Sequence, residues 1–194
     1  MKNKLLIKLV PLLSAALLLS ACVVQSSHPY YTKNLLVNTH TSIQGLWTAK
    51  KTVKPWVIKG KNLEFYAKNG AKSRIKLNFF KVNGVLYCDS TPKSPDRKTL
   101  HAIWVYHLYP THLLSQVVIT KTQIKFIPIN DSKLKALIKQ HKLVIPSTLP
   151  NASHSEENLY YATSATWVKF LKQYGTTAKL FNIKDAIILT HKAP

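Results

Sequence analysis

Acidic residues are scarce in this chain of 194 residues, which has seven carboxylates against 28 lysines and arginines. General acid–base catalysis needs titratable side chains held close together at a reacting group. Glu64 is expected on the outer face of a strand, Asp131 as the cap of a helix and Glu156-Glu157 in a loop. This distribution offers no acid–base pair, and we expect no catalytic residues.

Sequence motifs of common catalytic and cofactor sites are also missing. The chain has no Gly-x-Ser-x-Gly, His-Glu-x-x-His or Cys-x-x-Cys and no glycine-rich phosphate loop. His107 and His112 could meet a metal on one face of a strand pair, but His101 lies about 20 Å further along the strand. Because two imidazoles lack a third ligand, we expect no metal site and no cofactor.

The N-terminus carries the most specific motif of the chain. Three lysines within the first eight residues precede an uncharged apolar run at 9–21, shorter than the roughly 20 residues that span a bilayer. This pattern is typical of a signal peptide. Leu19-Ser20-Ala21-Cys22 resembles the lipobox of bacterial lipoproteins. The resemblance implies that residues 1–21 are removed and that Cys22 receives a lipid; the alternative is an ordinary secretory signal with a chance cysteine.

The lipoprotein resemblance also suggests a location. In Gram-negative lipoproteins an aspartate after the cysteine tends to retain the protein at the inner membrane, and Val23 stands here instead. In such an organism the resemblance implies an outer-membrane lipid anchor with the domain in the periplasm. Residues 23–41 are polar and lack periodicity, so 22–41 are expected to form a lipidated N-terminus and tether before one β-rich domain at 42–194.

Glycine is rare too, with five in the chain, and two of them follow asparagine. Asn-Gly between β-rich runs predicts a hairpin. Asn69-Gly70 separates 62–68 from 73–82, and Asn83-Gly84 separates the latter from 85–89. A two-residue turn at Asn83-Gly84 sets Phe79 opposite Cys88. Side chains alternate along strands, which predicts an inner face of Ile75, Leu77, Phe79, Leu86 and Cys88 and an outer face of Arg74, Lys76 and Asn78, with Phe80 as the exception.

Cysteine is also scarce, since only Cys22 and Cys88 are present. With Cys22 lipidated, the mature chain cannot form an intrachain disulfide. The hairpin register places Cys88 on the apolar face. We therefore expect a buried and unreactive thiol; a nucleophilic role for Cys88 is the alternative.

Further turns extend the strand pattern. A tight turn at Pro110-Thr111 would pair a strand at 104–108 with the strand that follows, and a turn at Lys121-Thr122 would set Ile119 opposite Ile124. Helices are predicted at 131–141 and from Thr163 or Ser164 onward, and final strands at 180–181 and 186–190. The fold class is β-dominated α+β, an antiparallel meander sheet or incomplete barrel with two short flanking helices.

Two further resemblances concern the fold. Gly45-Leu46-Trp47 resembles the Gly-x-Trp of lipocalins, although two predicted helices depart from the single helix usual there. The element order resembles small uncharacterised bacterial lipoproteins in which a β-meander ends with an Ala-Thr-x-x-x-x-Phe-Leu helix, as in 165–171. The latter resemblance covers most of the mature chain and implies no activity.

The positive charge is the remaining signal for function. The mature chain would keep 25 of the 28 cations against seven acids, a net charge of about +18. Such a charge favours polyanionic partners, and an exported lipoprotein rarely meets nucleic acid. Anionic lipid, lipopolysaccharide or an acidic envelope protein fits better; the alternative is a solvated, lysine-rich surface. The predicted anionic-surface patch consists of Lys50, Lys51, Lys54, Lys59, Lys61, Arg74 and Lys76.

These observations predict a non-catalytic, membrane-anchored envelope lipoprotein that binds or scaffolds a protein or an anionic envelope component. The alternative is a lipocalin-like carrier of an apolar ligand, which requires a closed barrel with an open apolar interior. An enzyme is the third hypothesis and would need polar residues that converge in a cleft, for example around His107.

Overall fold

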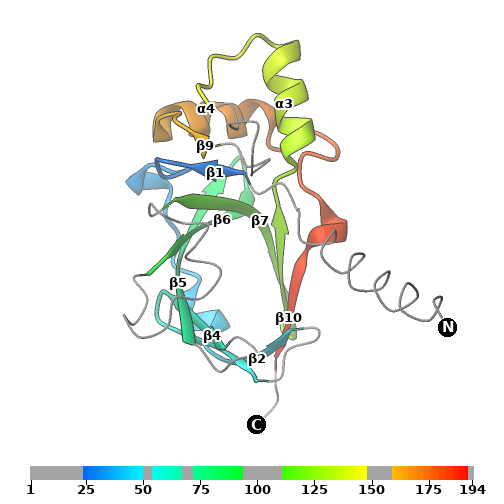
Figure 1. The fold of residues 1–194 in the computed structure, drawn as a ribbon. Coiled ribbons are helices and arrows are strands. Elements are labelled where there is room, and N and C mark those ends of the chain that lie inside the picture. The colour runs from blue at the N-terminus through cyan, green and yellow to red at the C-terminus, as the bar shows by residue number, and fades with distance from the viewer. Residues whose placement is uncertain (1–23, 50–53, 67–71, 94–110, 148–158, 192–194) are drawn as a thin grey trace, which may run out of the picture.

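The computed structural model describes residues 24–49, 54–66, 72–93, 111–147 and 159–191. Eight antiparallel strands close into a barrel in the order β6-β5-β4-β3-β2-β10-β8-β7, and β7 pairs with β6 to complete it (Figure 1). The barrel strands are β2 Gly45–Ala49, β3 Trp56–Lys59, β4 Asn62–Tyr66, β5 Lys72–Val82, β6 Val85–Pro92, β7 His112–Ile119, β8 Gln123–Pro128 and β10 Ile187–His191. The expected β-dominated α+β class is confirmed, with a closed barrel.

The hairpins around Asn83-Gly84 and Lys121-Thr122 are confirmed in register. Val82 pairs with Val85 and Phe79 with Cys88, and Asn83 and Gly84 both have a positive φ, 49° and 79°, as a tight hairpin turn requires. Ile119 pairs with Ile124 as predicted. β4 and β5 also pair as expected, and their turn at 67–71 lies outside the described residues.

The neighbours of β7 differ from the expected meander. Residues 94–110, which include the strand expected at 104–108, lie outside the described residues. Leu113–Gln116 of β7 pair with β6, and the other edge pairs with β8 and with β1 Gln25–Ser26. The pairing with β8 was predicted, whereas the pairings with β6 and β1 were not.

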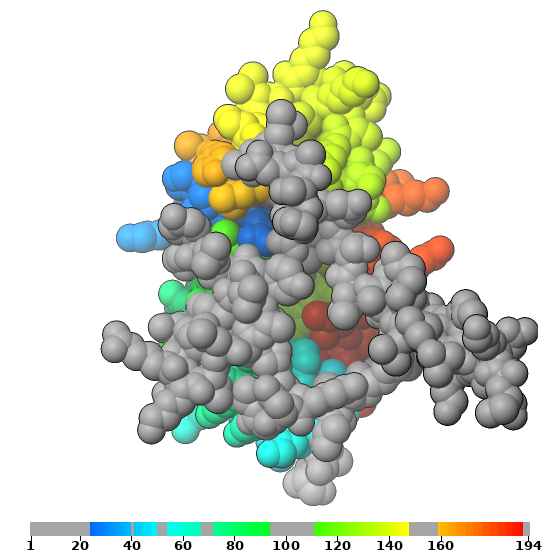
Figure 2. Space-filling view, viewed as in Figure 1, coloured from blue at the N-terminus to red at the C-terminus, as the bar shows by residue number. Residues whose placement is uncertain are grey.

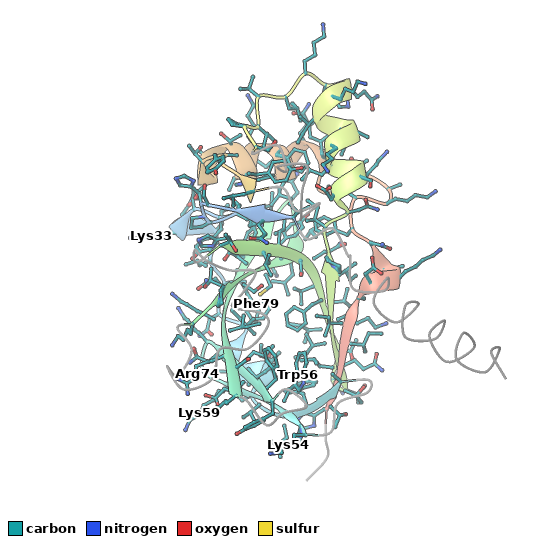
Figure 3. The ribbon with its side chains drawn as sticks, in the orientation of Figure 1. Lys33, Lys54, Trp56, Lys59, Arg74 and Phe79 are labelled. Carbon is teal, nitrogen blue, oxygen red and sulfur yellow. The ribbon has the colours of Figure 1, made fainter. Side chains whose placement is uncertain are left out.

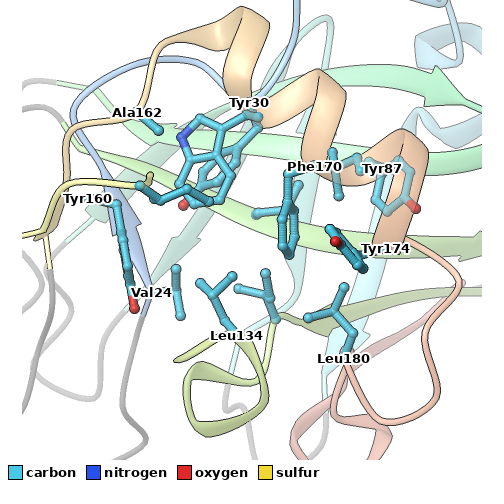
Figure 4. Packing of buried hydrophobic residues seen from close by; sticks show 14 of the residues in the cluster. Val24, Tyr30, Tyr87, Leu134, Tyr160, Ala162, Phe170, Tyr174 and Leu180 are labelled. Atoms are coloured by element: carbon cyan, nitrogen blue, oxygen red, sulfur yellow. The ribbon is translucent and has the colours of Figure 1, made fainter. Parts of the chain in front are cut away.

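The described chain has two hydrophobic cores, one on each side of the wall formed by β5, β6 and β7. The first lies inside the barrel and includes Trp47, Leu77, Phe79 and Cys88. The second lies outside this wall, beneath the helices α3 Asp131–Gln140 and α4 Ser164–Tyr174 (Figure 4). Outward-facing side chains of the wall belong to it, namely Phe80, Val82, Tyr87 and Leu114. Phe80 thus breaks the alternation because its outer face is also covered.

The N-terminal segment is part of this second core. β1 pairs with β7 and, in parallel, with β9 Leu159–Tyr160. Val24 is 3% exposed and Tyr30 0%. The short 3-10 helices η1 Lys33–Leu35 and η2 His40–Ile43 then lead to β2. This differs from the tether expected at 23–41, because the apolar side chains of the segment cover the outward-facing residues of the wall.

The two helices begin at side-chain caps. Asn130 caps α3 by accepting a hydrogen bond from the backbone N–H of Lys133, so the cap expected at Asp131 is wrong by one residue. Thr163 caps α4 in the same way, as one of the two predicted caps. The apolar face predicted for α4 is confirmed, since four residues are buried at helical spacing, namely Trp167, Phe170, Leu171 and Tyr174.

The C-terminal part closes the barrel. β10 pairs with β8 on one side and β2 on the other. The strand expected at 180–181 is absent from the described chain; Phe181 makes a single bridge to Ile129, and the 3-10 helix η3 Ile183–Asp185 precedes β10. The Asn130 N–H donates to the Leu180 carbonyl and the Asn182 N–H to the Pro128 carbonyl, so this segment is joined to the end of β8 by one bridge, while Leu180 is buried in the second core.

Candidate functional site

Cations gather on the outer face of β3, β4 and β5, at the end of the barrel opposite the helices (Figure 3). Alternation along β5 turns Ile75 and Leu77 into the barrel and Arg74 and Lys76 outward. The register aligns Lys76 with Asn62 and Arg74 with Glu64. We define the basic face as the described cations of this region, Lys54, Lys59, Lys61, Lys72, Arg74 and Lys76.

A tight turn brings two of these lysines beside β5. Lys59 pairs with Asn62 across the β3–β4 hairpin, and Gly60 adopts φ +56° in the turn. The carbonyl of Lys61 accepts the backbone N–H of Leu77 at 2.8 Å, which holds this turn level with the middle of β5. Lys59, Lys61 and Lys76 are all exposed.

Glu64 is the only acidic residue on the described part of this face. Its carboxylate lies 2.7 Å from Lys72 Nζ and 2.8 Å from Arg74 Nε. The hydrogen bond from Lys72, with the nearby positive charges, lowers the pKa of Glu64 from its ordinary value. Glu64 therefore stays ionised and offsets part of the charge of two cations.

An aromatic ring orients the cation at the edge of the face. The Lys54 ammonium lies 4.9 Å from the centre of the Tyr66 ring, a cation–π contact. Tyr66 pairs with Lys72 in the β4–β5 register. Tyr66 therefore lies between two lysines.

The predicted patch is brought together only in part within the described chain. Five of its seven residues belong to the basic face, while Lys50 and Lys51 lie outside the described residues. The predicted patch omitted Lys72. Lys72 pairs with Tyr66 in the same register that sets Glu64 opposite Arg74, so alternation places it on the same face. Cys22 also lies outside the described residues, so its lipidation stays a prediction.

A second polar constellation, which the sequence did not suggest, is the pair Asp89 and His112. Asp89 is fully buried, and its carboxylate oxygens lie 2.8 and 3.0 Å from His112 Nδ1. The same carboxylate accepts the Tyr30 backbone N–H at 2.9 Å. The arrangement fixes the imidazole and ties the N-terminal segment to β6. A signal was available, since alternation places Asp89, the one carboxylate of β5 and β6, on the outer face of this hairpin opposite Asn78.

The surroundings of His112 do not assemble known catalytic chemistry. Ser26 lies opposite His112 in the β1–β7 register, but its hydroxyl donates to the His28 carbonyl and accepts the Trp167 indole N–H. Among the described residues no three histidine, cysteine or carboxylate side chains are grouped to hold a metal. His101 and His107 lie outside the described residues.

The barrel interior is apolar and tightly filled at mid-height. Leu77, Phe79 and Cys88 are at most 2% exposed, so water has no space beside them. Burial raises the pKa of the Cys88 thiol well above its usual value, which disfavours the thiolate. This environment agrees with the predicted inert cysteine. A groove in the described surface lies instead where β2 and β10 pair, beside Thr48 and Ile188.

No family model matches the chain, and no curated protein or solved structure matches it either. Among the described residues, no helix has both the length and the apolar character needed to cross a membrane.

Proposed function

We propose that this protein is a non-catalytic, membrane-anchored envelope lipoprotein whose basic face binds an anionic component of the envelope. The observation that carries the proposal is the convergence of cations from β3, the β3–β4 turn and β5 on one exposed surface with Glu64 as its one described acid. Such a surface attracts polyanions over a Debye length of about 10 Å at 0.1 M salt.

The residue types suggest a diffuse interaction. Five of the six cations of the basic face are lysines, which act as mobile point charges, whereas arginine makes bidentate contacts with phosphates. Arg74, the sole arginine of the face, is already engaged by Glu64. Extended anionic surfaces therefore fit this face better than a single small phosphate compound.

The anchor is tested at its acceptor atom. Cys22→Ser should leave a precursor that is neither cleaved nor acylated, because the thiol is the acceptor that the lipobox resemblance implies. Mass spectrometry of the N-terminus reads both events. A native mature chain that begins elsewhere, or begins at Cys22 without lipid, would refute the anchor.

Binding is tested with the lipidated protein purified from membranes. We expect binding to at least one anionic component, with lipopolysaccharide and anionic vesicles tested separately, that weakens strongly between 0.1 and 1 M salt, as the Debye length falls from about 10 to about 3 Å. Reversal of Lys59, Lys61 and Lys76 to glutamate should abolish it and shift stability by only about 0.5 kcal/mol or less per site. The absence of salt-sensitive binding to every anionic surface tested would refute this function.

A lipocalin-like carrier of an apolar ligand is the second candidate, favoured by the closure of eight antiparallel strands into a barrel. The filled interior around Phe79 counts against it. A fluorescent fatty acid distinguishes the two. Saturable 1:1 binding that Leu77→Trp abolishes would support the carrier, and we expect no such binding.

A further inference from the structure

We infer that the basic face points away from the membrane that holds the protein and binds an extended polyanionic polymer beyond it. This inference rests on the proposed anchor and the proposed anionic partner. It adds the direction in which the face points and the class of its partner.

The first step is the position at which the chain leaves the fold. β1 is held by pairing with β7 and β9, and the Ser27 backbone N–H donates to the Tyr160 carbonyl at 3.0 Å. Val24, just before β1, is buried in the second core beside the helices. Two residues of chain reach at most about 7 Å, so a lipid on Cys22 must enter its bilayer close to this helical end.

The second step is the distance of the basic face from that end. Phe80 of β5 lies in the same core as Val24, and it bridges to Leu36 of the N-terminal segment. Lys76 and Lys72 precede Phe80 by four and eight residues on the same strand, which is about 13 and 26 Å at about 3.3 Å per residue. The basic face therefore begins well beyond the anchored end.

The third step is the character of the helical end itself. Figure 2 shows the yellow segment after α3 at the apex of the molecule. In this segment Val144 is 87% exposed. Tyr161, which follows β9 and is 44% exposed, is held beside the segment by its backbone N–H, which donates to the Pro146 carbonyl at 2.8 Å. Exposed lysines accompany them, namely Lys139, Lys142 and Lys172. Exposed apolar side chains surrounded by lysines are typical of surfaces that contact the interface of a bilayer. This end of the molecule therefore fits the anchoring membrane.

The fourth step is the shape of the charge on the basic face. Lys72, Arg74 and Lys76 follow one another along the outer side of β5 at about 6.6 Å intervals. Lys59 and Lys61 continue the row at the adjoining turn. A linear row of cations matches the repeating charges of an extended polymer.

The inference is tested by recruitment to anchored protein. Lipidated protein is reconstituted in neutral phosphatidylcholine vesicles, and fluorescent polyphosphate is added as the polymer. We expect recruitment that Lys59→Glu/Lys76→Glu weakens by about tenfold or more. The matched control Lys139→Glu/Lys142→Glu makes the same change in net charge at the helical end and should weaken recruitment less than about twofold.

The contrary outcomes are separable. Equal losses in both double variants would overturn the inference, because the charge would then act diffusely. Recruitment of phosphatidylglycerol vesicles without polyphosphate would overturn it in favour of a second membrane. If neither is recruited, but phosphatidylglycerol in the same vesicle protects Lys59 and Lys76 from an amine reagent, the face turns to its own membrane and only this inference fails. If no arm shows binding, the proposed function fails as well.

Discussion

Asp89 is the buried residue on which the junction between the N-terminal segment and the barrel depends. It accepts the Tyr30 N–H and holds His112, although it is fully buried. Asp89→Ala would leave the Tyr30 N–H and His112 Nδ1 without this hydrogen-bond partner, and each buried polar group left unsatisfied costs about 1–3 kcal/mol. We expect a loss of that size in the free energy of unfolding measured in urea.

Two comparison variants make the Asp89 test specific. Asp89→Asn should cost less, because its amide oxygen can still accept the Tyr30 N–H. Asp185→Ala removes an exposed carboxylate that accepts one exposed hydrogen bond from the Asn182 side chain, and should change stability by about 1 kcal/mol or less. A loss below about 1 kcal/mol for Asp89→Ala would show that the pair does not hold the junction.

Cys88 gives a test of the hairpin register at single-residue resolution. Its pKa is raised by burial, and it is 1% exposed opposite Phe79. Thiols react as thiolates, so the native protein should react slowly with a water-soluble thiol reagent and rapidly in denaturant. Peptide mapping identifies the labelled cysteine. Fast native labelling of Cys88 would contradict its burial and point to a functional thiol.

Among the elements, α4 ends under a tight steric constraint. The Gly175 backbone N–H donates to the Leu171 carbonyl, and a Cβ on Gly175 would collide with that carbonyl and with the Tyr87 hydroxyl. Gly175→Ala should therefore cost about 1–3 kcal/mol, as overpacking does. Thermal unfolding measures it, with the exposed neighbour Thr176→Ala as the control. Equal transition temperatures for the two variants would contradict the collision.

The elements also show how far the sequence determines the fold. The β5–β6 and β7–β8 hairpins were predictable, because local alternation and a two-residue turn set their registers. The pairing of β7 with β6 was not, since it joins segments separated by a long stretch of chain. β1 and β9 have two residues each, too few for any alternation to appear.

The candidate site likewise has a part that could be predicted from local sequence and a part that could not. Outward placement of Arg74 and Lys76 follows from alternation and was predictable. Asp89 and His112 come from different strands, and their contact depends on the non-local β6–β7 pairing. Phe80 was recognised as an exception without a reason, because its cover comes from the distant N-terminal segment and α4.

At the scale of the whole molecule, the structure predicts that the N-terminal segment is required for folding. Val24 and Tyr30 are buried, and the Tyr30 ring lies 4.7 Å from that of Trp167. Each buried apolar side chain of this size contributes about 1.5–3 kcal/mol, while domains have a stability of only about 5–15 kcal/mol. Loss of the segment would also expose Phe80 and Tyr87.

Two truncated chains separate a structural segment from a tether. A chain that begins at Asn38 should lose its cooperative urea transition and bind a dye specific for exposed apolar surface, because the second core is uncovered. A chain that begins at Val24 keeps every described contact of the segment and should unfold like the mature protein. If both chains unfold cooperatively at the same urea concentration, residues 24–37 act only as a tether, and the anchored end would no longer be held to the helices.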